Sequence, residues 1–159
     1  MLSKEKIPLL VAEIKGELAK LEKLVQRLAT QQGRVDDEEI SESAALRLHN
    51  FYTGCERIFK LIASEVNGVL SQNLDWHKRL LNQMALEVPG IRPAVISPAT
   101  RTVLEELLNF RHVVRNIYGF ELKPERVEEL VTITIALFPQ FASEIEAFTA
   151  FLLDVLKQS

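Results

Sequence analysis

Residues 4–31 of the chain read KEKIPLLVAEIKGELAKLEKLVQRLATQ, and this stretch decides the fold class. Its apolar residues recur at alternating intervals of four and three positions: Ile7, Val11, Ile14, Leu18, Leu21, Val25 and Leu28. This spacing is typical of a helix that packs lengthwise along another helix. The stretch is therefore predicted to form a long amphipathic helix, with its charged residues on the other faces.

A second stripe of the same kind follows the polar stretch that begins at Gly33. Its members are Leu48, Tyr52, Cys55, Phe59, Ile62, Val66 and Val69. A short connection between two long helices favours antiparallel neighbours. The first two helices are therefore predicted to form an antiparallel hairpin, with Tyr52 and Cys55 in the core.

The rest of the chain predicts one short helix and two further long ones. The short helix opens near Asn73 or Asp75, and Pro89, Gly90 and Pro93 make the connector that follows it non-helical. Ser97 and Pro98 are typical of a helix start, since a serine can cap the first turn and proline suits the first position. This helix carries a stripe of Val103, Leu107, Phe110, Val114 and Ile117.

The last helix is predicted to start at Pro124. Its stripe consists of Val127, Val131, Thr134, Phe138, Phe141, Ile145, Phe148, Leu152 and Val155, and Pro139 inside it predicts a kink or a short break. No segment alternates with period two for the length of a strand. The sequence thus predicts an all-α fold, an antiparallel four-helix bundle with one additional short helix, as a single domain over residues 1–159.

Composition narrows the function classes. The chain has 19 Lys and Arg against 22 Asp and Glu, a net charge of −3, so no overall positive field attracts nucleic acid or anionic lipid. Its single cysteine, Cys55, rules out an internal disulfide and a cysteine-based zinc cluster. No Glu-x-x-His pair, P-loop or Gly-x-Ser-x-Gly occurs, so we expect no metal and no cofactor. A cytoplasmic protein that does not span a membrane is expected.

One stretch stands out chemically: residues 110–120 read FRHVVRNIYGF. Arg111 and Arg115 lie one helical turn apart, and Tyr118 falls close to the same face, at the border of the apolar stripe. One interpretation is a pair of half-buried arginines held by glutamates, with Glu56 as the simplest partner. The other is an anion site, because two guanidinium groups at this spacing can hold a phosphodiester through bidentate hydrogen bonds.

Three blocks of the chain, in this order, resemble HepT-like proteins of the HEPN superfamily. They read AALRLHNFYTGCERIF at residues 44–59, DWHKRLLNQM at 75–84 followed by RPAVI at 92–96, and FRHVVRNIYGFEL at 110–122. The resemblance covers roughly residues 40 to 155. It implies an all-helical homodimer that acts as the toxin beside a minimal nucleotidyltransferase (MNT) antitoxin.

The resemblance also implies site residues. In active members an Arg-x4-6-His motif from each subunit meets at the dimer interface and cuts RNA without metal, and a tyrosine two residues after the histidine receives AMP from the partner. Carried onto this chain, the arginine is Arg111 and the tyrosine is Tyr118, whereas Asn116 fills the place of the histidine. Asparagine cannot carry a proton near neutral pH. The predicted catalytic set is Arg111, Asn116 and His112, with Arg111 and Arg115 binding the RNA phosphate.

Three functions stay open at this point. The first is a ribonuclease toxin that acts as a homodimer, and the second is a non-catalytic module of the same fold that binds a nucleotide or the nucleotidyltransferase. The third is a structural bundle whose arginines are only ion-paired. For the homodimer, Leu104, Leu108 and Leu122 are predicted to leave apolar surface for a second copy. His77 is predicted to pack against the helix that carries Arg111, in a structural role.

Overall fold

The predicted stripes become four long helices and one short helix in a computed structural model that describes residues 2–67, 74–116 and 122–158. The helices are α1 (Ile7–Gln31), α2 (Glu38–Ile62), α3 (Trp76–Met84), α4 (Pro98–Asn116) and α5 (Pro124–Lys157). A 3₁₀ turn precedes α1, and a π-helical turn continues α2 over Ala63–Asn67. The described residues contain no strand beyond one isolated bridge between Val88 and Arg92. The all-α prediction is confirmed.

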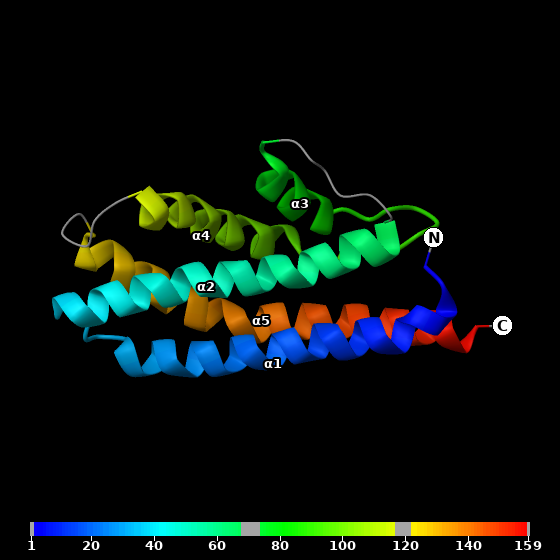
Figure 1. Ribbon diagram of the computed structural model, residues 1–159, viewed down its shortest axis with the longest axis horizontal. Coiled ribbons are helices and arrows are strands. Elements are labelled where there is room, and N and C mark those ends of the chain that lie inside the picture. The colour runs from blue at the N-terminus through cyan, green and yellow to red at the C-terminus, as the bar shows by residue number, and fades with distance from the viewer. Residues whose placement is uncertain (1, 68–73, 117–121, 159) are drawn as a thin grey trace.

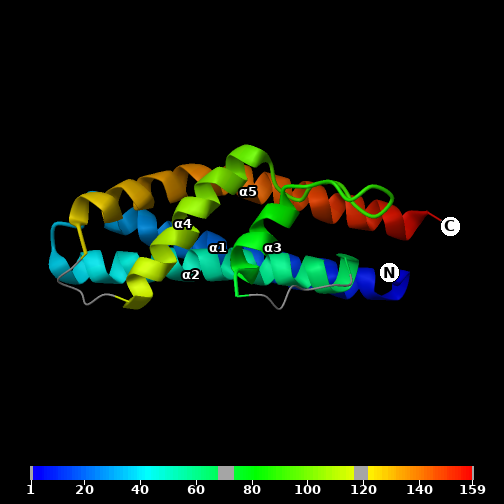
Figure 2. The ribbon, with the colours of Figure 1, turned by 90° about the horizontal axis from the view of Figure 1, so that it is seen from above.

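The long helices pack as an antiparallel bundle (Figure 1). The helix α1 runs antiparallel to its neighbours α2 and α5, and α4 runs antiparallel to the same two helices on the other side. The short helix α3 lies against α2 and α4, outside the four-helix core (Figure 2). Two of the sequence blocks quoted above, one on α3 and one that begins on α4, are thereby brought to one side of α2.

Apolar side chains from the helices form one continuous core. At its centre, Phe51 and Phe59 of α2 meet Phe141 of α5 edge to face, with ring centroids 6.4 and 6.2 Å apart. Such aromatic pairs each contribute about 0.5–1.5 kcal/mol beyond their buried area. Tyr52 and Cys55 are fully buried in this core, as predicted.

Local side chains define where the helices begin. The Asp37 carboxylate accepts a hydrogen bond from the Ile40 N–H at 3.2 Å and caps α2. The Ser97 hydroxyl accepts one from the Thr100 N–H at 3.2 Å and caps α4, which confirms the predicted start of that helix. Because α4 begins at this fixed point, the register of its later residues against α2 is set.

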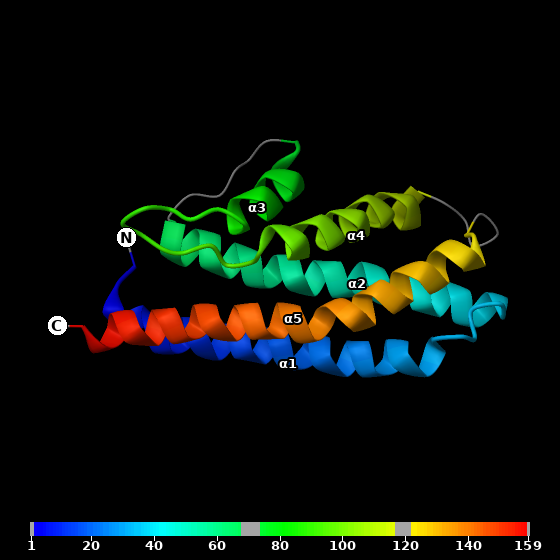
Figure 3. The same cartoon turned by 180° about the vertical axis from the view of Figure 1, so that it is seen from behind.

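The helix α5 continues through Pro139 without a break. The ribbon of α5 changes direction part-way along its length (Figure 3). Within the described residues, α5 is the one helix whose length and composition suit a membrane span, a test that the core helix of a soluble protein also passes. In this bundle α5 packs against α1, α2 and α4 and buries ten of its residues.

The inward face of α4 differs slightly from the predicted stripe. Leu107 and Phe110 are buried as predicted, together with Thr100 and Leu104, and Val103 is only half-buried. Leu104 is 0% exposed, so the prediction that it leaves apolar surface for a second copy is wrong. Leu108 and Leu122 are partly buried against the same core.

Candidate functional site

The buried stripe of α4 continues from Leu107 to Phe110, and Arg111 follows at its border. An arginine therefore stands beside the apolar face that packs on the rest of the bundle. Its side chain is half-buried, and the core residue Phe110 lies directly before it. A guanidinium group at such a position needs polar neighbours, because burying an unpartnered charge is costly.

Among the described residues, the polar side chain in contact with Arg111 is His77 in the first turn of α3. The Arg111 Nη1 atom lies 3.4 Å from His77 Nδ1 and 3.3 Å from His77 Nε2. The two distances are almost equal, so the guanidinium nitrogen lies against both ring nitrogens of the imidazole. The contact confirms the prediction that His77 packs against the helix that carries Arg111.

The other side of this contact is Glu56 of α2. Its Oε2 atom lies 2.6 Å from His77 Nδ1, and the two side chains are 4% and 24% exposed, respectively. A buried carboxylate that accepts the Nδ1 proton orients an imidazole ring and selects its tautomer. We call Glu56, His77 and Arg111 the polar cluster.

The predicted partnership of Glu56 with Arg111 is wrong as a direct ion pair. Among the described residues, Arg111 forms no ion pair with a carboxylate within 4.0 Å, and Glu56 reaches it only through His77. The geometry of Arg111 therefore does not fit the interpretation in which this arginine is simply paired with a glutamate.

One aromatic side chain, Trp76, packs against the polar cluster. The Trp76 ring stacks on the His77 ring with centroids 3.6 Å apart and 31° between the planes. The Lys60 Nζ atom lies 4.4 Å from the centroid of the Trp76 ring, within the range of a cation–π contact. The imidazole is thus held by a ring and a hydrogen bond, with part of its surface still open.

Two buried atoms beside the cluster have unused hydrogen-bonding capacity. Tyr52 Oη and Arg111 Nε are buried and have no hydrogen-bond partner among the described residues. Burial raises the pKa of Tyr52, and the neighbouring Glu56 carboxylate raises it further, so the phenol is neutral at physiological pH. Buried polar groups are usually satisfied, and unsatisfied ones call for an explanation such as a ligand or water.

The other predicted site residues lie outside what the structure describes. The backbone of His112, Arg115 and Asn116 belongs to α4, but their side chains are not described. Tyr118 lies outside the described residues altogether. Of the predicted set, the structure therefore places only Arg111 in contact with other polar side chains.

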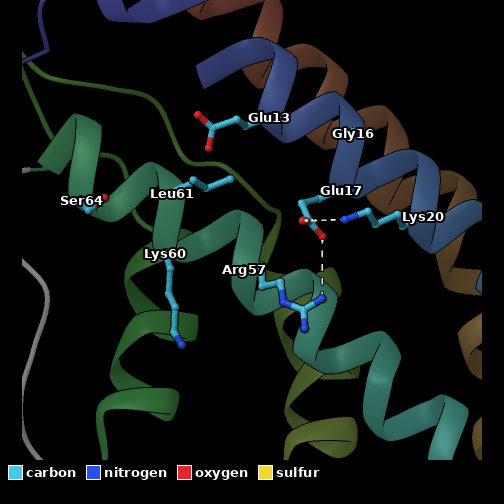
Figure 4. A pocket seen from close by; sticks show the side chains of 8 residues that line it. All are labelled: Glu13, Gly16, Glu17, Lys20, Arg57, Lys60, Leu61 and Ser64. Carbon is cyan, nitrogen blue, oxygen red and sulfur yellow. Dashed lines mark hydrogen bonds and ion pairs between the residues drawn. The ribbon is translucent and has the colours of Figure 1, made fainter. Parts of the chain in front are cut away.

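A separate hollow lies between α1 and α2 (Figure 4). It has a volume of about 520 Å³, and its polar lining consists largely of residues that neutralise one another. Glu17 lies 3.5 Å from Lys20 and 4.0 Å from Arg57. No group of three or more His, Cys, Asp or Glu side chains placed to hold a metal occurs in the described residues.

The comparison with protein families now adds an independent finding. A family model described as HepT-like protein matches residues 43–152, more than two thirds of the 159-residue chain. The chain belongs to the HepT-like protein family. No curated protein and no solved structure matches it significantly.

Family membership supports placement in the HEPN-type superfamily, and the all-α fold agrees with it. The match covers Glu56, His77 and Arg111, so the polar cluster lies inside the HepT-like part of the chain. The helix α1 precedes the matched residues but forms one side of the same bundle.

Proposed function

We propose that this HepT-like protein is the toxin of a bacterial toxin–antitoxin module, a cytoplasmic homodimeric endonuclease that cuts RNA without a metal ion. The observation that carries the proposal is the guanidinium of Arg111, which lies at the border of the buried face of α4 and contacts His77, while its Nε atom has no hydrogen-bond partner among the described residues. In a family with RNA-cleaving members, this is the position of the motif arginine.

The chemistry assigned to Arg111 is electrostatic. When the ribose 2′ hydroxyl attacks the adjacent phosphorus, negative charge builds up on the phosphate oxygens before the bond to the 5′ oxygen breaks. A guanidinium group binds phosphate oxygens through paired hydrogen bonds and stabilises that charge best where water is largely excluded. Arg115, one turn further along α4, is proposed to bind the same phosphate.

The proposed partners follow from the family. A second copy of the chain is proposed to complete the site, and a nucleotidyltransferase antitoxin is proposed to silence it by attaching AMP to Tyr118. A nucleotide placed two positions after Asn116 would put a negatively charged phosphate near the arginines. It would then compete with RNA for the same cations.

The test compares two arginines of the same helix. Purified protein is incubated with single-stranded RNA in EDTA, as wild type, Arg111→Ala and the control Arg101→Ala, whose guanidinium pairs with Glu105 at 2.7 Å. We expect cleavage by wild type and Arg101→Ala, and a loss of roughly 10²–10³-fold in Arg111→Ala, the usual effect of removing one charge-stabilising donor. Equal rates for all three proteins, or cleavage only with added Mg²⁺, would contradict the proposal.

A second candidate function is a non-catalytic binding module of the same fold. The observation that favours it is Asn116, which stands where the motif has its proton-carrying histidine. This candidate predicts no cleavage by the wild type, together with RNA or nucleotide binding that Arg111→Ala abolishes. A filter-binding assay on the same three proteins distinguishes the two functions.

A further inference from the structure

The polar cluster contains a histidine that the motif spacing does not reveal. His77 lies 34 residues before Arg111 in the chain, yet its ring is in contact with the guanidinium group. The two residues come from different helices, α3 and α4, that pack against each other (Figure 2). A histidine therefore lies beside the proposed motif arginine, although none stands at the motif spacing.

The hydrogen bonding of His77 suits proton transfer. Its Nδ1 atom is 2.6 Å from the buried Glu56 carboxylate, so this nitrogen donates, and the lone pair of a neutral ring is on Nε2. Arg111 Nη1 lies 3.3 Å from Nε2, so the nitrogen that carries the lone pair and the guanidinium group that would hold the phosphate are direct neighbours. A carboxylate that orients an imidazole whose far nitrogen faces the reacting group is the recurring arrangement of general bases.

We propose that His77 is the proton-transferring residue of the RNA cleavage site and that Glu56 is its positioning residue. This inference rests on the proposed ribonuclease function. His77 Nε2 removes the proton from the ribose 2′ hydroxyl as the 2′ oxygen forms a bond to phosphorus. The bond from phosphorus to the 5′ oxygen breaks, and that oxygen takes a proton from water. The hydroxide left behind recovers the proton from His77, so that the products are a 2′,3′-cyclic phosphate and a free 5′ hydroxyl.

The experiment is chemical rescue with the full-length chain on single-stranded RNA in EDTA. The variants are His77→Ala, His77→Gln, Arg111→Ala and the control His49→Ala, a histidine of α2 outside the polar cluster. We expect His77→Ala to lose roughly 10²–10⁴-fold in rate, the typical contribution of a positioned acid or base. Added imidazole should restore cleavage by His77→Ala in proportion to its concentration and leave Arg111→Ala inactive. His49→Ala should match the wild type.

Each outcome decides a separate point. If the wild type does not cleave, the proposed function and this inference both fall. If the wild type cleaves and His77→Ala retains its rate within about threefold, well short of the loss that a proton-transferring residue causes, the inference falls and the ribonuclease stands. If a folded His77→Ala loses cleavage and imidazole does not restore it, His77 only positions Arg111 and the inference is overturned. Where thermal melting shows that His77→Ala is unfolded, the same criteria apply to His77→Gln, which retains a polar side chain of similar size.

Discussion

Two arginines of this bundle differ in the groups that their guanidinium nitrogens contact. Arg92 is 3% exposed and donates to three backbone carbonyl oxygens at 2.8, 2.9 and 3.0 Å, so it holds the connector between α3 and α4 against the end of α3. Arg111 Nη1 instead contacts the ring of His77, and Arg111 Nε has no hydrogen-bond partner among the described residues. The first arginine is bound to the backbone, whereas the second is the one proposed to bind a phosphate.

A residue-scale prediction concerns Glu144, which links α5 to the start of α4. Its carboxylate accepts hydrogen bonds from the Ser97 N–H at 3.1 Å and from Gln140 Nε2 at 2.6 Å. Burial alone raises the pKa of Glu144, but these hydrogen bonds outweigh it and leave the pKa below the ordinary value of 4.5. Ionised Glu144 therefore stabilises the fold above about pH 4.5, and this contribution is lost as the pH falls through the lowered pKa. The free energy of unfolding should thus decrease less between pH 6 and pH 3 in Glu144→Gln than in the wild type.

Urea unfolding at a series of pH values checks this difference, with Glu146→Gln as the control because that side chain is exposed. At pH 6 we expect Glu144→Gln to be less stable by about 1 kcal/mol, the usual net value of a hydrogen bond. Parallel pH curves for the wild type and Glu144→Gln would show that this carboxylate does not hold α4 as described.

Sequence reasoning reached part of this site and missed the rest for a physical reason. Arg111 could be predicted because an arginine beside an apolar stripe is visible in one helix. The contacts among Glu56, His77 and Arg111 join residues 21 and 34 positions apart, and no helical spacing rule operates over such distances. Only the packing of α3 against α2 and α4 brings them together. The contact of His77 with the arginine's helix was predictable, whereas its hydrogen bond to Glu56, on which its proposed role depends, was not.

At the scale of elements, apolar periodicity predicted where the helices run because each must bury one face. The apolar pattern predicted less accurately which face of α4 turns inward. The helix buries Leu104, whereas the predicted stripe contained the preceding residue, Val103. Such a shift follows from the oblique course of α4 across α2 (Figure 2). The apolar spacing within one helix does not reveal the angle at which that helix crosses its neighbour. Pro139 predicted a kink or a short break in α5, and the helix continues through it without a break while packing against α1, α2 and α4.

Two glycines test the packing of α1 against α2. A Cβ atom on Gly54 of α2 would lie 2.5 Å from Cδ2 of the buried Leu21 and 3.3 Å from its Cγ. A Cβ atom on Gly16 of α1 would meet nothing within 4 Å. Overpacking costs about 1–3 kcal/mol, and replacing a helical glycine with alanine gains about 1 kcal/mol. We expect Gly54→Ala to lower the free energy of unfolding by up to about 2 kcal/mol and Gly16→Ala to raise it by about 0.5–1 kcal/mol.

Chemical denaturation of the two variants beside the wild type measures both effects. The two substitutions are chemically identical and each lies inside a long helix, so their helix-propensity terms cancel in the comparison. Equal stability changes in the two variants would mean that α1 and α2 do not approach each other closely at Gly54.

At the scale of the whole molecule, α3 covers only part of α4. Val113, two residues after Arg111, is 41% exposed, an apolar side chain on the helix that is proposed to meet a second copy. The net charge of −3 further limits how many phosphates the protein can neutralise, so RNA binding should depend only weakly on salt. The exposed Val113 and the low net charge are both consistent with a phosphate site that has few arginines and lies at an interface between two chains.

The homodimer leads to a prediction about this exposed residue. Val113→Asp should shift the protein from dimer to monomer at micromolar concentration, because a charge buried in an interface without a partner is unfavourable. Thermal stability of the monomer should change little, since the side chain is exposed within one chain. Leu9→Asp on α1, at a side chain that is 65% exposed, is the control and should remain dimeric. Light scattering after size-exclusion chromatography distinguishes these outcomes, and a monomeric wild type would refute the dimer.

The central claim is that this HepT-like protein cuts RNA by using the RNA's own 2′ hydroxyl, without metal. The most direct measurement is mass spectrometry of the products formed in EDTA from a single-stranded RNA oligonucleotide and from the DNA oligonucleotide of the same sequence. We expect RNA fragments that end in 2′,3′-cyclic phosphate and an intact DNA strand. Fragmentation of both strands, or of neither, would contradict it.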